Sequence, residues 1–401
     1  MSKKGRMVTG NQDLIRRMNR SLIIKAIMEK ESISRSELEV LTHLALPTIM
    51  RIVASLIEEG LVEEVGKGDS SGGRKPIMLK MKSDGMYFIG VGIQRVIHVV
   101  LADISGNILA RYSSELKYQV SIDVILGQIL KGIDKVIKQS KIDISKLMYA
   151  GIGTPATEHK HGSKIGVYPV DDWGYTSEEE WQKNDKFPCP VVFENNATLT
   201  ALGEFVFGVA KNCDNFLHVT ADYGVGAGVV IGGKLYTGTD GVAGEFGHTI
   251  VDVDGLPCYC GNKGCLEMYC STSAIINLYI KDKMADPALK QKLIDSTDFI
   301  LLKDAAYGGD KVAYKYITES ARILGMGISG LVNMFNPEMI IIGGELPETF
   351  PEYVEMVGKS ARSGIFRNKA TNLNIIESEL KSDAMVRGAV ALAMAQVFDH
   401  I

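Results

Sequence analysis

The sequence predicts a mixed α/β protein with an N-terminal winged helix-turn-helix domain and a larger body made of two α/β halves. Three observations lead to this prediction. Three helical segments and then two short apolar strands follow one another within residues 1–82. Strands and helices alternate through residues 83–401 in two successive sets. A chain of 401 residues is also long enough for two or three domains, each with its own core.

The first two helices of residues 1–82 are indicated by apolar spacing and by a capping motif. A helix is expected after Asn19, with its apolar face formed by Leu22, Ile23, Ile24, Ala26 and Ile27. Ser34 and Glu37 have the spacing of a capping box, in which each side chain bonds the backbone of the other residue. This motif predicts a short second helix that ends at about Thr42.

A tight turn over residues 43–45 then leads into a third helix, which carries Pro47 near its start and ends at Gly60. Its apolar face is formed by Ile49, Ile52, Val53, Leu56 and Ile57. Two strands, 61–65 and 77–81, are expected next, joined by a glycine-rich loop. Helix, turn, helix and two-stranded wing is the order of a winged helix-turn-helix, whose second paired helix enters the DNA major groove.

The residues expected to contact DNA come from this helix and from the wing. Thr48, Met50 and Arg51 are the exposed candidates near the start of the helix. Arg74 and Lys75 lie in the wing loop, and Arg74 could enter a narrow minor groove. The alternative is a three-helix protein-interaction module whose basic residues only face solvent.

The charge of residues 1–82 favours DNA binding, whereas two apolar residues near the start of the third helix favour sparse reading of bases. Residues 1–82 hold 15 Lys and Arg against 10 Asp and Glu, a formal +5, whereas the rest of the chain carries −9. A basic head on an acidic body favours contact with a polyanion. Ala45 and Leu46, however, are apolar where many DNA readers have serine, lysine or asparagine, so sparse reading of bases is expected.

The body begins with three strands in antiparallel succession, 87–93, 96–103 and 108–116, followed by a helix at 122–139. Strands at 147–152 and 191–193 and a helix at 197–207 complete the first set. The second set has strands 216–221 and 228–235 around a glycine-rich turn, helices through 271–335, strands 339–342 and 374–376, and a helix at 384–397. We expect one lobe at 83–195, completed by about 381–401, and a second at 196–380, with a ligand cleft between them.

A cysteine-rich segment predicts a zinc site. His248, Cys258, Cys260 and Cys265 follow the spacing H-x9-C-x-C-x4-C, and four such ligands close a tetrahedral zinc shell. A site filled entirely by protein ligands is structural, not catalytic. The alternative is a group of buried reduced thiols that pack as small apolar side chains.

Other functional classes are not favoured by the sequence. No apolar run approaches the ~20 residues that cross a bilayer. The N-terminus is basic and lacks the apolar region of a secretory signal. Six cysteines, three of them in the zinc motif, do not suggest a disulfide framework, so a cytoplasmic location is expected.

Several motifs resemble those of one family across nearly the whole chain. GEFGH followed by CYCGNKGCLE resembles the signature of the ROK family, the repressors, open reading frames and kinases. SRSELEVLTHLALPTIMRIVASLIEEGLV resembles the DNA-binding head of its repressors, and FPCPVVFENNATLTALGE the segment that carries the catalytic position of its sugar kinases. GVGAGVVIGGKLYTG and MIIIGGEL are similar to its phosphate-side and adenosine-side loops. The resemblance implies an actin-like, ribonuclease-H-like body, a cytoplasmic location, and a homodimer or homotetramer.

The resemblance also implies a sugar site. The residues that match sugar-contacting positions are Asn195, Glu245, His248 and Glu267, and Asn196 matches the catalytic aspartate. Carboxylates suit this task because each accepts two hydroxyl hydrogen bonds. Asn195 and Asn196 could instead cap the helix that follows them. The loop 157–175 is expected to line the pocket, and xylose, glucose and an N-acetylhexosamine are all plausible ligands.

Three departures from the kinase pattern argue against catalysis. Asn196 cannot accept a proton at neutral pH as an aspartate does. The stretch 92–96 lacks the acid and the Gly-Gly-Thr turn of the kinases, and Asp222 and Tyr223 put an acid and a ring beside the second phosphate loop. We therefore expect a sugar-responsive repressor with no catalytic residue. The alternatives are a sugar kinase that also binds DNA and an architectural DNA-binding protein with an inactive body.

Overall fold

The protein is described here from a computed structural model. The described residues are 12–30, 32–67, 75–116, 121–157, 164–166, 176–177, 181, 185–283, 299–366 and 373–398. The chain divides into two compact units: Met1–Ile152 with Glu180–Val192 and Ala389–Ile401, and Gly153–Glu179 with Phe193–Gly388. Arg74 and most of the loop 157–175 lie outside the described residues, so their expected contacts remain predictions.

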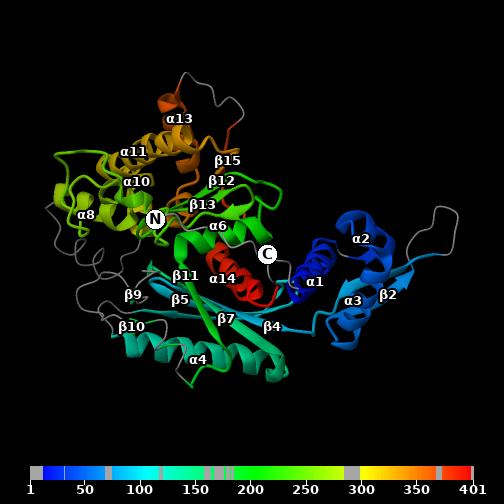
Figure 1. Cartoon of the computed structure of the whole chain (residues 1–401). Coiled ribbons are helices and arrows are strands. Elements are labelled where there is room, and N and C mark those ends of the chain that lie inside the picture. Colours follow the sequence, from blue (N-terminus) through cyan, green and yellow to red (C-terminus); the bar gives the residue numbers. More distant parts are fainter. Residues whose placement is uncertain are drawn as a thin grey trace, which may run out of the picture. The chain divides into compact units, whose positions relative to one another are not determined.

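The N-terminal region contains the expected helices and wing strands (Figure 1). Its elements are α1 Gln12–Glu29, β1 Ile33–Ser34, α2 Arg35–Thr42, α3 Leu46–Glu58, β2 Val62–Lys67 and β3 Ile77–Met81. The three strands form one antiparallel sheet in the order β1-β3-β2. The first helix begins at Gln12, before Asn19, so the predicted start was too late. The capping box of α2 is confirmed, because Ser34 and Glu37 bond each other's backbone.

The turn between α2 and α3 is held by local hydrogen bonds. The hydroxyl of Thr42 donates to Leu38 O (2.6 Å) and accepts from Leu44 N (3.4 Å). His43 ends α2 in the left-handed region, with φ of 55°. The two helices are bent by 119° relative to each other, within the range of helix-turn-helix pairs. In the described part of the chain no single helix is long and apolar enough to cross a membrane, and only this bent pair, taken together, has the length and composition.

The first body sheet has the order β11-β7-β4-β5-β6. Its strands are β4 Tyr87–Ile93, β5 Val96–Asp103, β6 Ile108–Glu115, β7 Leu147–Thr154 and β11 Val191–Asn195. The predicted antiparallel succession β4-β5-β6 is confirmed by the pairing of their residues. Helix α4, Ile122–Ser140, lies along one face of this sheet (Figure 1). A short 3-10 turn, Ile144–Lys146, follows the helix in the sequence. Every residue of β4 is buried, which makes it a central strand.

The second body sheet has the order β14-β13-β12-β15-β16. Its strands are β12 Phe216–Ala221, β13 Val225–Ile231, β14 Lys234–Leu235, β15 Met339–Gly343 and β16 Asn374–Glu377. The helices of this part are α6 Asn196–Phe207, α7 Glu267–Cys270, α8 Thr272–Lys283, α10 Phe299–Tyr307, α11 Lys311–Phe335, α12 Glu345–Thr349, α13 Tyr353–Gly364 and α14 Ala384–Ala395, with 3-10 turns at Phe246–His248 and Lys381–Asp383. A small sheet of β8 Ala156–Thr157, β9 Lys164–Gly166 and β10 Thr176–Ser177 was not foreseen.

Two layers of side chains cover the two faces of the second sheet. Leu217, Val219 and Ala221 of β12 pack in a large core that includes α10, α11 and α13. Phe216, on the opposite face, packs with Ala201 of α6. Because side chains alternate along a strand, residues 216, 218 and 220 face α6 and residues 217, 219 and 221 face the helical layer. The predicted fold class, mixed α/β with a helical N-terminal region and two sheets, is confirmed.

The prediction of one strand over 228–235 was wrong. The strand ends at Ile231, and Gly232 and Gly233 form a turn with φ of 59° and 69° that leads into β14. The strand also begins earlier, at Val225, so Gly226, which was predicted in the turn, lies inside the strand together with Gly228. A Cβ on Gly228 would come within 2.4 Å of the Cβ of Ala201 in α6. These glycines are needed because helix and strand approach closely, a reason that belongs to packing and not to phosphate binding.

Candidate functional site

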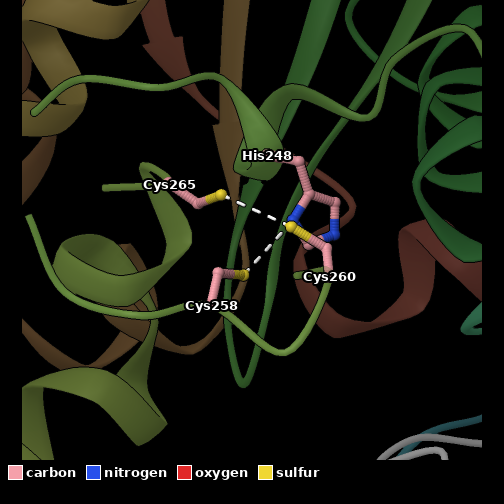
Figure 2. A group of neighbouring side chains, drawn as sticks. All are labelled: His248, Cys258, Cys260 and Cys265. Atoms are coloured by element: carbon pink, nitrogen blue, oxygen red, sulfur yellow. Dashed lines mark hydrogen bonds between the residues drawn. The ribbon is translucent and has the colours of Figure 1, made fainter. Parts of the chain in front are cut away.

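Four side chains converge where the sequence predicts a metal site (Figure 2). One ligand atom from each of His248, Cys258, Cys260 and Cys265 lies within 4.8 Å of all the others. Nδ1 of His248 is 3.6 Å from Sγ of Cys258, and Sγ of Cys260 is 3.6 Å from Sγ of Cys265. In a tetrahedral zinc site the donors are separated by about 3.5–3.8 Å, as bond lengths of ~2.0–2.3 Å require. The donor set and its spacing therefore fit a metal ion such as zinc.

The backbone brings these ligands together through a short closed loop. Val251 N donates to Gly264 O (2.8 Å) and Leu266 N donates to Thr249 O (2.9 Å), so the two ends of the loop are paired. Within it, Cys258 N donates to Asn262 O (2.8 Å). Gly264 has φ of 70°, and a Cβ there would lie 1.6 Å from Asp252 O. Only glycine fits this crossing, so the glycine-rich composition follows from the geometry of the loop.

The ring nitrogen of His248 that faces away from the thiols contacts Tyr259. Nε2 of His248 lies 2.9 Å from the Tyr259 hydroxyl, and the two rings meet edge to face with centroids 5.1 Å apart. The same nitrogen is 3.9 Å from Oε2 of Glu245. Glu267 is close enough to bond the tyrosine hydroxyl, and removal of that hydroxyl from water, together with this carboxylate, raises the pKa of Tyr259. Sequence reasoning missed Tyr259, because a tyrosine between two cysteines has no signature of its own.

The two candidate carboxylates are held against β13. Glu267 is buried, and its Oε2 accepts from Val225 N at 2.8 Å. Gly244, with φ of 92°, lies against Ala227, whose N–H donates to Gly244 O (2.9 Å). Glu245 follows it with half of its side chain exposed. Partial desolvation raises the pKa of Glu245, the Glu267 carboxylate adds to this, and His248 opposes it.

The two asparagines begin α6, whose first turn packs on the same strand at Gly226. Asn195 is the N-cap residue, and its Oδ1 accepts from Ala197 N at 2.7 Å. Its Nδ2 donates to Pro155 O at 3.4 Å. The capping alternative is thus correct for Asn195, whereas Asn196, the first residue of the helix, is half-buried. Glu245, Glu267 and the start of α6 all gather at one end of β13.

An acidic edge lies where strands β12, β15 and β16 end. Asp222 follows β12, Glu377 ends β16, and Glu348 lies in the short helix after β15. Partial burial raises the pKa of Glu348, and the carboxylates of Asp222, Glu377 and Asp383 raise it further against the opposing charge of Lys381. Such an edge repels a polyphosphate unless cations accompany it.

In the head, the expected DNA contacts differ in exposure. Met50 is 54% exposed, Arg51 and Lys75 are exposed, and Thr48 is half-buried. Among the described residues, Arg51 forms no ion pair. Several carboxylates of the head are engaged internally, because Arg20 pairs with Glu59 and Arg35 pairs with Glu64.

Known proteins resemble this chain along most or all of its length. Residues 89–396 match the ROK family. The xylose repressor of Caldicellulosiruptor bescii is 30% identical over 392 residues, which cover 97% of this chain and 98% of that protein. The N-acetylglucosamine repressor of Escherichia coli O6:H1 is 28% identical over 407 residues, covering 100% and 98%.

Solved structures give the same picture. A crystal structure of a ROK family transcriptional regulator, a homologue of the E. coli MLC protein, superposes with a TM-score of 0.79 at 26% identity and covers 96% of this chain and 97% of that one. A ROK family glucokinase from Streptomyces griseus, in complex with glucose and AMPPNP, reaches a TM-score of 0.64 at 27% identity. It covers 76% of this chain and 98% of its own. The matches to the regulators therefore include the N-terminal region. The match to the kinase leaves about a quarter of the chain uncovered, a length similar to that of the N-terminal region.

Proposed function

The chain belongs to the ROK family, and from that premise we propose that it is a sugar-responsive transcriptional repressor of carbohydrate-use genes. The observation that carries this proposal is coverage. The xylose repressor and the solved regulator match at least 96% of this chain, including the helix-turn-helix head, whereas the glucokinase matches 76%. Phosphoryl transfer does not require a DNA-binding head, so the head that this chain shares with the regulators favours regulation.

Operator DNA binds through the N-terminal domain. Helix α3 enters the major groove, where Met50 and Arg51 are exposed for contact and the half-buried Thr48 lies in the first turn of the helix. Arg74 and Lys75 of the wing bind the adjacent backbone or minor groove. A homodimer carries two such heads and a homotetramer carries four, so that two half-sites can be bound together. A repressor acts where its operator DNA is, so a cytoplasmic location is part of this proposal.

The sugar binds at the end of β13. The carboxylates of Glu245 and Glu267 accept sugar hydroxyls, and His248 presents Nε2 to the same space. Asn195 and Asn196 border this space. The capping role of Asn195 uses its Oδ1, so its contact with a sugar is made through the amide nitrogen Nδ2. The names of two relatives suggest D-xylose and N-acetylglucosamine as the first sugars to examine.

The zinc ion has a structural role in this proposal. His248, Cys258, Cys260 and Cys265 fill a tetrahedral shell, which leaves no position for a substrate. When bound, the ion clamps the loop between Glu245 and Glu267, two residues that flank its ligands in the sequence. Its function is therefore to keep the sugar-binding groups in position.

Kinase activity is the second candidate, favoured by the glucokinase likeness, and two features weigh against it. An amide at Asn196 replaces the base that accepts the proton of the attacking hydroxyl. The acidic edge of Asp222, Glu348, Glu377 and Asp383 lies at the loops that resemble the nucleotide side of the kinases. A coupled ADP-release assay with D-xylose, D-glucose and N-acetylglucosamine distinguishes the two. Sugar-dependent turnover would establish the kinase, and no turnover is expected.

The repressor proposal itself is tested with DNA selected from a random pool by the full-length protein. Affinity for the selected duplex is measured by fluorescence anisotropy without sugar and with each sugar in turn. Specific binding that one sugar weakens is expected. Binding that is indistinguishable from non-specific DNA would end the proposal.

A further inference from the structure

Two apolar side chains are exposed on the face of α3 that is not packed in the head. Leu46 is 38% exposed and Met50 is 54% exposed. They are four residues apart in a helix, so they are neighbours on one face. Ala45 before them and Ala54 one turn later are exposed as well, which extends the apolar strip. The opposite face is buried through Ile49, Ile52, Val53 and Leu56.

The position of this strip is fixed from the neighbouring helix. Oε1 of Glu39 in α2 accepts from Leu46 N at 3.2 Å, so a hydrogen bond joins this side chain to the first turn of α3. Ala45 O accepts from Thr48 N (2.9 Å) and Ile49 N (3.2 Å), which closes that turn. Glu39 is therefore engaged at the start of the helix. Leu46 and Met50 project from a turn whose backbone is already hydrogen-bonded.

The chemistry of these side chains limits what they can recognise. Leucine and methionine offer no hydrogen bond to a base edge, so they cannot read the donor and acceptor pattern of guanine, cytosine or adenine. The one apolar group in the major groove is the C5 methyl of thymine. Arg51, exposed on the next position of the same helix, supplies the positive charge that a phosphate or guanine requires.

We propose that Leu46 and Met50 determine operator specificity by packing against thymine methyl groups in the major groove. This inference rests on the proposed function, because it requires that α3 is the recognition helix. It also replaces the expectation of sparse base reading: the apolar start of the helix reads bases through shape and methyl contact. The partner is duplex DNA with thymine at the positions facing this strip.

The test uses deoxyuridine, which keeps the hydrogen-bonding edge of thymine and lacks only its methyl group. The full-length protein first selects duplexes from a randomised pool. The selected duplex is then resynthesised with each thymine replaced singly by deoxyuridine. For the wild type, at least one position in each half-site should lose about fourfold in affinity, the effect of one buried methyl group of ~0.8 kcal/mol.

Protein variants identify the side chain that makes each contact. Leu46→Ala and Met50→Ala should bind the thymine duplex about fourfold or more weakly and should no longer distinguish thymine from deoxyuridine at their own position. Leu46→Met and Met50→Leu keep an apolar contact and should keep the distinction. Arg51→Ala should weaken both duplexes equally. Leu109→Ala, which removes a leucine that is 47% exposed in β6, is the matched control and should change neither.

The outcomes separate this inference from the function on which it rests. If the wild type binds a selected duplex specifically and every deoxyuridine substitution is silent, methyl reading is wrong while DNA binding stands. If both alanine variants keep full discrimination but lose self-association in analytical ultracentrifugation, the strip is a protein interface and the inference is also wrong. If no duplex is selected above non-specific binding, the proposed function itself fails. Thermal melting of each variant verifies that the head is folded.

Discussion

The hydroxyl of Tyr259 lies 2.9 Å from Nε2 of His248, on the side of the imidazole that faces away from the three cysteines. With Nδ1 directed at the metal position, Nε2 carries the proton and has one hydrogen bond to donate. The Tyr259 hydroxyl therefore accepts the one hydrogen bond that Nε2 of His248 could otherwise donate to a sugar hydroxyl. Glu245 and Glu267 are close by, so the tyrosine stands among the groups proposed to bind sugar.

Tyr259→Phe should strengthen sugar binding. The change frees one hydrogen bond of ~0.5–1.5 kcal/mol, so affinity for the responsive sugar should rise by about 2- to 10-fold in isothermal titration calorimetry. Zinc content, measured in the same preparation, should stay at the wild-type value. Weaker sugar binding at unchanged zinc content would instead make the tyrosine a direct sugar ligand.

Cys260→Ser should lower zinc content and the response to sugar together. Loss of one thiolate opens the shell, and the loop between Glu245 and Glu267 loses its clamp. Elemental analysis gives the zinc content and anisotropy gives the sugar response of DNA binding. Cys213→Ser removes a buried cysteine outside the cluster and should leave both unchanged. A zinc-free Cys260→Ser protein with wild-type sugar affinity would break the proposed link.

Glu204→Ala should destabilise the second unit. This carboxylate is fully buried and accepts from the Ser378 hydroxyl (2.5 Å), Leu380 N (3.2 Å) and Val209 N (3.1 Å). Its removal leaves one buried and two partly buried donors without their acceptor, so the free energy of unfolding should fall by about 3 kcal/mol in urea denaturation. The matched control is Glu338→Ala, where an exposed carboxylate accepts from Asn215 N, and about 1 kcal/mol or less is expected. Equal losses for the two variants would show that burial does not matter here.

Replacing His218 should reduce the loss of stability in acid. The ring is fully buried on the face of β12 toward α6, with Nδ1 3.4 Å from the Thr220 hydroxyl, and burial lowers the pKa of His218 from 6.5 to about 3. The folded protein keeps it neutral, whereas the unfolded chain takes up a proton below pH 6.5. The contribution of neutral His218 to the unfolding free energy is therefore fully present above pH 6.5 and is lost as the pH falls toward 3.

His218→Gln removes this proton uptake. Between pH 7 and pH 5 the wild type should lose about 2 kcal/mol more unfolding free energy than the variant, from one group shifted across that window. Urea denaturation at the two pH values measures the difference. If the difference in unfolding free energy between wild type and variant is the same at both pH values, His218 is not kept neutral by the fold and the prediction is wrong.

Local signals in the sequence were enough for much of the fold. The strand at 77–81 and the strand at 216–221 were predicted with their observed bounds, because apolar runs end at clear polar or glycine boundaries. The capping box at Ser34 and the convergence of His248 with three cysteines were also predictable. In each case the residues that interact lie close together in the sequence.

What was missed depends on contacts between distant segments. Gly226 was predicted in a turn and Gly228 at the start of a strand, but the need for glycine at both positions comes from the close approach of α6, which the local sequence does not reveal. Strands of two or three residues, such as 156–157, are too short for any periodicity. The acidic edge joins Asp222 to Glu377 and Asp383, which meet only when the sheet has formed. Tyr259 contacts His248 through the fold of the loop alone.

The central claim is that one chain couples sugar binding to release of operator DNA, and a thermodynamic cycle tests it most directly. Affinity for the selected duplex is measured with and without saturating sugar, and affinity for that sugar is measured with and without saturating duplex. Coupling requires both affinities to fall by the same factor, typically about 5- to 150-fold. Duplex affinity that is equal with and without each bound sugar would contradict the claim.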